Sequence, residues 1–183
     1  MNISVVISPP GGTTTNSLSP ASTRSVMRTS ASISSDVPIV SSYSMPNRSR
    51  QKSATRIDAG RPPRFHYDLA RRLLPLRAEG VMIVGSGNIV HNLRRIDWDD
   101  QRAPTEAWAG SFDATAKDLI RKGLHEDLIQ YEQLEHASAA VPTNDHYLPL
   151  LYALGAQQPG ETVEFLYEGF QYANISMRSL SIG

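Results

Sequence analysis

The strongest constraint on the fold of this chain is a break in composition near residue 57, because only the part after it can build a core. Residues 1–55 hold 21 serine or threonine residues, and their apolar residues follow no sustained helical or strand period. Such a segment buries too little apolar surface to offset the entropy of ordering it. We therefore predict a disordered Ser/Thr-rich segment over 1–56 and one folded domain over 57–183.

The origin of residues 1–56 is open to three interpretations. The segment is a native tail, an organellar transit peptide, or an upstream stretch translated in the wrong reading frame. Its serine and arginine content and its single acidic residue, Asp36, fit a transit peptide, but its poor amphipathic character does not.

Composition and charge exclude several classes of function. The chain has no cysteine, which excludes disulfides, zinc–thiolate sites, iron–sulfur clusters and cysteine nucleophiles. Residues 57–183 carry 12 basic and 17 acidic side chains, a balance that disfavours nucleic acid as a partner. No apolar stretch approaches the roughly 18–20 residues that cross a bilayer, so we expect no membrane partner and a soluble, cytoplasmic protein.

The pattern after residue 57 predicts an α/β fold, a mixed sheet flanked by helices. Val81–Val84 has the apolar, β-branched character of a strand buried on both faces. Gly85 and Gly87 then predict a glycine turn with backbone angles and close approaches that a side chain would forbid. Helical spacing and boundary residues predict helices over 64–79, 105–122 with Thr105 as N-cap, 124–138 and 142–155. Alternating residues predict strands within 162–169 and 174–183.

Five histidines are the candidate functional residues. His125 and His136 lie among acidic residues and are expected on the surface, and His66 is expected to be capping or exposed. His91 and His146 each follow a turn-forming stretch and precede an apolar segment, which places an imidazole at the exit of a rigid bend. A buried histidine bonded to a backbone carbonyl is the competing interpretation for both.

Two familiar motifs are not supported. The stretch GSGNIVHNL lacks the Lys-Ser/Thr of a phosphate-binding P-loop and the third glycine of the dinucleotide fingerprint. Asp145 and His146 could belong to a hydrolase with a serine nucleophile, but the chain has no G-x-S-x-G elbow.

Longer motifs resemble one known family. The stretches LRAEGVMIVGSGNIVHNLRRIDW, WAGSF, AVPTNDHYLPLLYALGA and EGFQYANISMRSLSIG occur in this order within 57–183. They are similar to the DODA-type class III extradiol ring-cleavage dioxygenases, and they correspond to the C-terminal half of a typical member. The resemblance implies the C-terminal half of the class III extradiol dioxygenase subunit-B fold.

The resemblance also implies a function and a site. It implies an oxidoreductase of aromatic compound metabolism that opens a catechol-type, DOPA-like ring with O2, using non-haem Fe(II), with zinc as the alternative metal. His91 matches the metal-binding histidine of the S-G-N-x-V-H-N motif. His146 matches the active-site histidine of P-T-x-x-H-Y, which is viewed either as a metal ligand or as a catalytic acid/base beside the metal. Asn88 and Asn92 are expected to orient the ligand rings. A homo-oligomer remains open.

One departure from the family leads to a second hypothesis. Members of the family supply further histidine ligands from their N-terminal half, whereas residues 1–56 contain no histidine. Two imidazoles alone hold Fe(II) weakly, so we expect this chain alone to have little or no activity. The alternative to an active dioxygenase is thus an inactive truncated remnant or a binding module.

Overall fold

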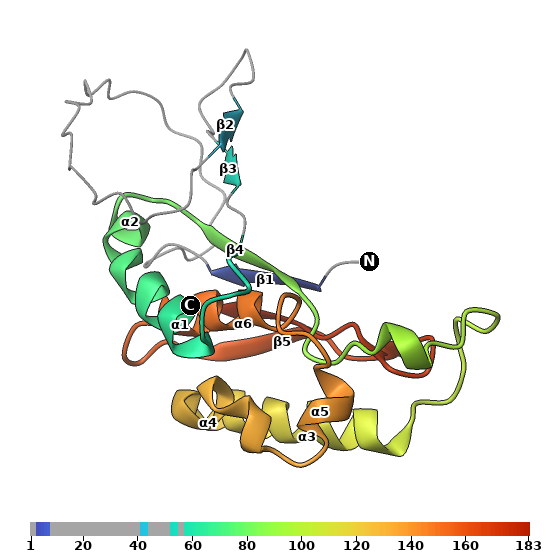
Figure 1. The fold of residues 1–183 in the computed structure, drawn as a ribbon. Helices are drawn as coiled ribbons and strands as arrows, with labels where there is room; N and C mark the ends of the chain where they lie inside the picture. The colour runs from blue at the N-terminus through green and yellow to red at the C-terminus, as the bar shows by residue number, and fades with distance from the viewer. Residues whose placement is uncertain (1–2, 8–40, 44–51, 55–56) are drawn as a thin grey trace. The chain divides into compact units, whose positions relative to one another are not determined.

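The computed structural model describes residues 3–7, 41–43, 52–54 and 57–183, which fall into two units (Figure 1). In the smaller unit, β2 (Ser41–Tyr43) pairs antiparallel with β3 (Lys52–Ala54). Most of the segment predicted to be disordered, 1–56, lies outside the described residues. The part of that segment that is described forms β2, β3 and a third strand, β1 (Ile3–Ile7). The domain boundary at residue 57 therefore stays a prediction.

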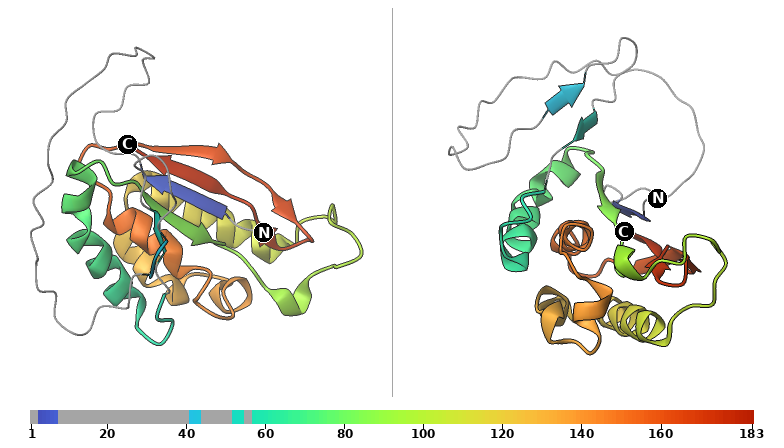
Figure 2. Two further views of the ribbon diagram at one scale, coloured as in Figure 1. Left: turned by 90° about the horizontal axis from the view of Figure 1, so that it is seen from above. Right: turned by 45° about the vertical axis from the view of Figure 1, so that its right-hand side comes forward.

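The larger unit is built on a mixed four-stranded sheet, as predicted. Its strands are β1 (Ile3–Ile7), β4 (Ile83–Gly87), β5 (Val163–Tyr167) and β8 (Ser179–Ile182), in the order β4-β1-β8-β5. β1 runs parallel to β8, whereas the β1–β4 and β5–β8 pairs are antiparallel (Figure 2). A short antiparallel ribbon, β6 (Phe170–Gln171) and β7 (Ile175–Ser176), precedes β8.

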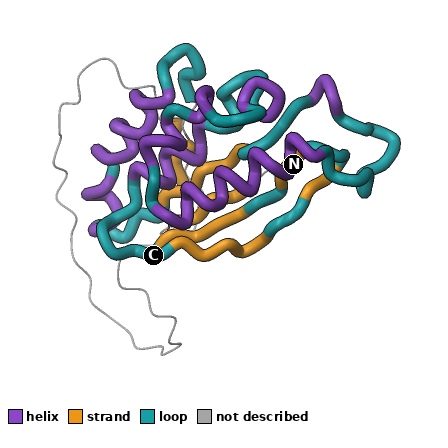
Figure 3. Tube along the Cα trace, turned by 90° about the horizontal axis from the view of Figure 1, so that it is seen from below, coloured by secondary structure: helices purple, strands orange, loops and turns teal. Residues whose placement is uncertain are grey.

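The helices form layers on one side of this sheet (Figure 3). α6 (Leu148–Gly155) packs against β4 and β1, and α1 (Pro63–Arg72) packs on α6. The remaining helices are α2 (Leu74–Ala78), α3 (Ala107–Lys122), α4 (His125–Ile129) and α5 (Ala137–Ala140). Leu148, Leu151 and Leu154 of α6 are fully buried and form the centre of the core. No helix in the described part of the chain combines the length and apolar content of a membrane span.

The strand before the histidine differs from its prediction in position and burial. β4 begins at Ile83 and includes Gly85 and Gly87, so the predicted glycine turn is strand. Val81, Met82 and Val84 are 42%, 53% and 50% exposed, so the prediction of burial on both faces is wrong. β4 lies at the edge of the sheet, where the helices cover only one of its faces.

Two helix predictions also need correction. The helix expected over 124–138 is three short pieces, α4, a 3₁₀ turn at Tyr131–Gln133 and α5, and His136 interrupts it with a left-handed φ of 67°. Thr105 is not the N-cap of α3, because that position falls at Glu106, which makes no side-chain capping bond. The predicted end at Gly123 is confirmed, where a φ of 68° closes the helix.

A buried ion pair ties α3 to the C-terminal strands. Asp113 on α3 is 4% exposed, and its carboxylate accepts hydrogen bonds from the guanidinium of Arg178 and from Oγ of Ser176. The backbone carbonyl of Ser176 in turn accepts a 2.8 Å hydrogen bond from the side-chain amide of Asn88, just after β4. This chain of bonds fixes the position of the segment that carries His91.

Candidate metal centre

The backbone of the His91 loop is fixed from three directions. The amide of Asn88 donates to the carbonyl of His146 at 2.8 Å, and the amide of His91 donates to the carbonyl of Ala140 at 2.9 Å. The amide of Asn92 donates to Oδ1 of Asn174 at 3.0 Å. Residues 88–92 are all buried. The position of His91 is therefore set by buried hydrogen bonds to separate parts of the fold.

Gly85 and Gly87 bring His146 close to this loop. A Cβ added at Gly87 would lie 2.1 Å from the carbonyl oxygen of His146, and one at Gly85 would lie 2.5 Å from that of Pro149. Both distances are far below van der Waals contact, so only glycine lets the start of α6 approach β4 this closely. The glycines serve close packing of the two elements, and the bend that the sequence predicted there is absent.

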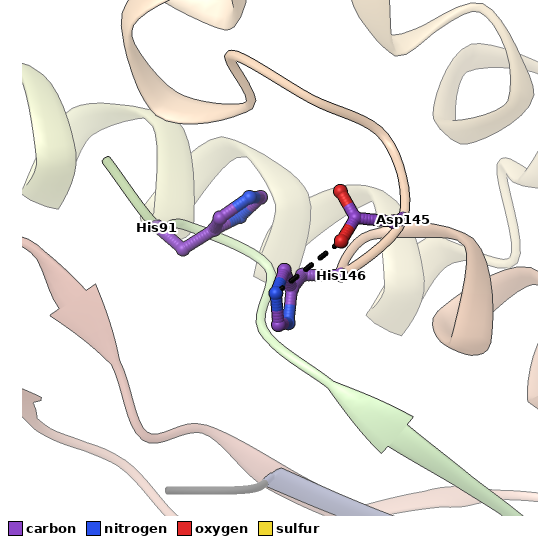
Figure 4. A group of neighbouring side chains, drawn as sticks. All are labelled: His91, Asp145 and His146. Carbon is purple, nitrogen blue, oxygen red and sulfur yellow. Dashed lines mark ion pairs between the residues drawn. The ribbon is translucent and has the colours of Figure 1, made fainter. Parts of the chain in front are cut away.

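The two candidate imidazoles lie side by side. Their ring centroids are 4.7 Å apart with an interplanar angle of 52°. Asp145 joins them, and its Oδ2 is 3.4 Å from Nε2 of His146 (Figure 4). One ligand atom from each of His91, Asp145 and His146 lies within 4.8 Å of the others. The structure thus brings His91 and His146 together with the carboxylate of Asp145. The sequence pattern suggested Asp145 only as part of a hydrolase dyad.

His91 is the buried member of this cluster. It is 3% exposed, its Nδ1 is buried without a hydrogen-bond partner among the described residues, and its Nε2 has only a long 3.5 Å contact with Oγ1 of Thr143. Burial, reinforced by the neighbouring His146 and opposed by Asp145, lowers the pKa of His91 to about 4. The imidazole is therefore neutral at physiological pH, which is the form that binds a metal ion.

Asp145 supplies negative charge at the more open side of the cluster. Partial burial disfavours its charged form, but a hydrogen bond with Thr143 and the proximity of His146 outweigh this and lower the pKa of the carboxyl. The side chains of Asp145 and His146 are about half exposed, at 50% and 46%. Both can therefore adjust their rotamers around the fixed ring of His91.

A family comparison fits this geometry. Residues 53–182 match the model of the catalytic LigB subunit of aromatic ring-opening dioxygenase, which covers more than half of the chain. The chain belongs to the LigB family. Its predicted resemblance to the class III extradiol dioxygenases is thereby confirmed.

Individual relatives agree with this membership. The chain is 41% identical over 130 residues to a 4,5-DOPA dioxygenase extradiol of Escherichia coli (strain K12), a match that covers 69% of this chain and 48% of the relative. It is 32% identical over 126 residues to the protein of the same name from Portulaca grandiflora, covering 67% of this chain and 45% of the relative. The chain thus spans about half the length of these two curated relatives.

A solved structure supports the fold. The crystal structure of the uncharacterized protein JW3007 from Escherichia coli K12 superposes with a TM-score of 0.62 at 37% sequence identity. The match covers 68% of this chain and 52% of that one. This similarity confirms the predicted fold class. The α/β fold is that of the class III extradiol dioxygenases, as the sequence motifs implied.

The donor set fits the metal dependence that is general in the LigB family. Two imidazoles and one carboxylate are the ligands of non-haem Fe(II) sites that keep open positions for substrates, and zinc accepts the same atoms. Two donors each ~2.1 Å from one ion lie at most ~4.2 Å apart. The three atoms lie within 4.8 Å of one another, so His146 and Asp145, which are half exposed, would have to turn toward His91 to hold one ion.

The asparagines that flank His91 do not orient its ring, contrary to the prediction. The side-chain amide of Asn88 donates to the carbonyl of Ser176, and that of Asn92 donates to the carbonyl of Ala139 at 2.8 Å. Both side chains therefore hold the loop backbone in place. Among the described residues, the side chain within hydrogen-bonding distance of a nitrogen of the His91 ring is that of Thr143, in the turn before α6.

The other histidines lie outside the cluster. His66 is fully buried on α1 and contacts the hydroxyl of Tyr152 through Nδ1 at 3.1 Å, so the prediction of an exposed or capping residue is wrong. His125 is partly buried and bonds to the hydroxyl of Tyr67 at 2.9 Å. His136 is also partly buried and forms the left-handed junction before α5.

A cavity of about 230 Å³ opens beside the cluster. It is lined by Asn88, His91, Leu93, Ile96, Trp98, His146, Tyr172 and Ile175. A wider cleft of about 650 Å³ includes Thr143 and Asp145 but neither of the two histidines. The smaller cavity is therefore the one whose contents can contact both imidazoles.

Proposed function

We propose that this site performs extradiol cleavage of a catechol-type diol by O2 around a non-haem Fe(II) ion. The proposal includes His91 and Asp145 as metal ligands, and it gives His146 two alternative roles, a third metal ligand or the catalytic acid/base. The observation that carries it is the buried, neutral imidazole of His91, with an unpartnered nitrogen, 4.7 Å from the ring of His146 at the wall of a cavity. Membership of the LigB family supports the class of reaction.

The proposed role of His91 is to hold the ion at a fixed place. Its buried position and low pKa keep the ring neutral, so protons do not compete for it near neutral pH. A bound Fe(II) would supply open positions for the diol and O2 and the electron transfer between them. The hydrogen bonds that the amides of His91 and Asn92 donate to Ala140 and Asn174 keep the imidazole in a fixed position.

The proposed role of His146 is proton transfer. It lines the cavity, remains half exposed, and has the carboxylate of Asp145 beside it. When it is not bound to the ion, the imidazole of His146 can accept a proton from a diol hydroxyl and later donate it to the ring-opened product. The apolar side chains of Leu93, Ile96 and Ile175 restrict the water around the diol.

Metal content and turnover together test this proposal. The purified chain, reconstituted anaerobically with Fe(II), is analysed for iron and then assayed with DOPA or catechol in air. We expect stoichiometric iron that is lost in His91→Ala and kept in His136→Ala, a matched histidine control outside the cluster. Formation of a ring-opened product that depends on His146 supports the proposed reaction.

Two other results would separate the alternatives. Stoichiometric iron without turnover means that the chain is a metal-binding module or an inactive remnant, which is the alternative raised by the sequence. Iron that binds equally well in His91→Ala contradicts the proposed metal site itself.

A further inference from the structure

An aromatic pair forms one side of the cavity beside His91 and His146. The rings of Trp98 and Tyr172 have centroids 5.8 Å apart at an interplanar angle of 49°, and both residues line the cavity. Trp98 is 66% exposed although it is among the most costly side chains to leave in water. Neither residue belongs to the metal cluster, so the packing of the site does not explain why they lie there.

The backbone of Tyr172 is held in an unfavourable conformation. Tyr172 has a φ of 52° and Ala173 a φ of 66°, both in the left-handed region that non-glycine residues avoid. Backbone strain of this kind is unfavourable, and it clusters at active and ligand-binding sites. The strained turn joins β6 to β7 and determines where the ring of Tyr172 lies.

Hydrogen bonds tie this turn to the loop that carries Trp98. The amide of Tyr172 donates to the carbonyl of Gln101 at 3.0 Å, and the amide of Glu106 donates to the carbonyl of Ala173 at 2.9 Å. Within the loop, Oδ1 of Asp97 accepts from the amides of Asp99 and Asp100, both at 3.2 Å. The two aromatic residues are therefore positioned as a pair, and neither is carried by a free loop.

We propose that Trp98 and Tyr172 form an aromatic wall that binds the ring of the diol. The proposal rests on the proposed function, because the wall lies beside the imidazoles that would hold the ion to which the diol binds. The cavity of about 230 Å³ is below the ~300–1,000 Å³ of pockets for drug-sized ligands, which suits a small aromatic diol. Aromatic side chains attract a ring through offset or edge contacts.

The test measures binding, so that it does not depend on turnover. The Trp108→Phe protein leaves Trp98 as the one tryptophan, because the chain has two. Its fluorescence is titrated anaerobically with catechol. We expect saturable quenching as catechol binds beside Trp98.

Variants of the wall then use a probe that needs no tryptophan. Binding of 4-nitrocatechol, followed by absorbance, should weaken about five- to tenfold in Trp98→Ala and Tyr172→Ala and about twofold or less in Trp98→Phe. Leu124→Ala is the matched control, since Leu124 is 43% exposed and does not line the cavity. Circular dichroism and thermal melting confirm that each variant is folded.

The outcomes test the aromatic wall and the proposed function separately. Unchanged affinity for 4-nitrocatechol in folded Trp98→Ala and Tyr172→Ala overturns the wall and leaves the proposed function intact if iron and turnover persist. Absence of any diol binding also overturns the wall, while the iron content of His91→Ala still decides whether the metal site exists.

Discussion

Replacing Gly87 with alanine tests the packing that places the two histidines together. A Cβ at this position would lie 2.1 Å from the carbonyl oxygen of His146 and 2.9 Å from Cγ of Pro149. Ordinary contacts begin near 3.4 Å, so β4 and the start of α6 must separate by more than ~1 Å. That shift would also break the 2.8 Å hydrogen bond from the amide of Asn88 to the same carbonyl.

The magnitude follows from these two effects. Overpacking a well-packed contact costs about 1–3 kcal/mol, and leaving a buried hydrogen-bonding group unpaired costs about 1–3 kcal/mol more. Because the two losses share one displacement, we expect Gly87→Ala to lower the free energy of unfolding by about 3 kcal/mol. The displaced His146 should also weaken metal binding at least about tenfold.

Urea unfolding and metal titration of the same preparations measure both effects. Gly110→Ala is the matched control, since Gly110 lies in α3 and its added Cβ would meet only Cγ2 of Thr105 at 3.8 Å. Alanine is the better helix former, so this variant should be as stable as wild type or up to about 1 kcal/mol more stable. Surface substitutions usually change the free energy of unfolding by less than about 0.5 kcal/mol. If Gly87→Ala differs from wild type by no more than this and still binds metal, the close packing of Gly87 does not matter and the prediction is wrong.

Three further predictions concern stability. Arg178→Ala leaves the carboxylate of Asp113 buried without its partner and should cost about 3–5 kcal/mol in urea unfolding, whereas Lys122→Ala, which removes an exposed pair, should cost about 0.5 kcal/mol or less. Ala173→Gly relieves a left-handed φ of 66° and should raise the melting temperature, an expectation contradicted by any clear decrease. In metal-free protein, the pKa of His91 is about 4 when folded and near 6.5 when unfolded, so the unfolded chain binds more protons between these values. The free energy of unfolding of wild type, relative to that of His91→Gln, should therefore fall by at most about 3 kcal/mol as the pH drops from 6.5 to 4. The same pH dependence in both proteins would refute this prediction.

The features that follow from local patterns could be predicted from the sequence. The helical spacing around Phe112 and the stop at Gly123 identified α3, and the alternation after residue 162 identified β5 and β8. The motifs that contain His91 and His146 identified the two rings that the structure places together. Each of these signals depends on neighbours within a few positions along the chain.

The features that depend on distant contacts could not be predicted. Gly87 looks like a turn residue until the carbonyl of His146 is found against it, and His66 looks exposed until α6 is packed on α1. Asp145 precedes His146 in a polar turn. Its proposed role as a metal ligand becomes visible only in the fold, where His91 from another part of the chain lies beside it. The same is true of Trp98 and Tyr172, which are far apart in sequence.

The two imidazoles have contrasting surroundings, and the contrast suits a site that must be both rigid and adaptable. His91 is buried, neutral and fixed through its backbone, so it can define the position of an ion but cannot respond to a substrate. His146 is half exposed and has the carboxylate of Asp145 beside it. Its ring can therefore rotate and contact a molecule bound in the cavity. A close approach between β4 and α6, made possible by two glycines, joins these unlike residues. The chemistry proposed for the site therefore depends first on backbone packing and only then on the histidines themselves.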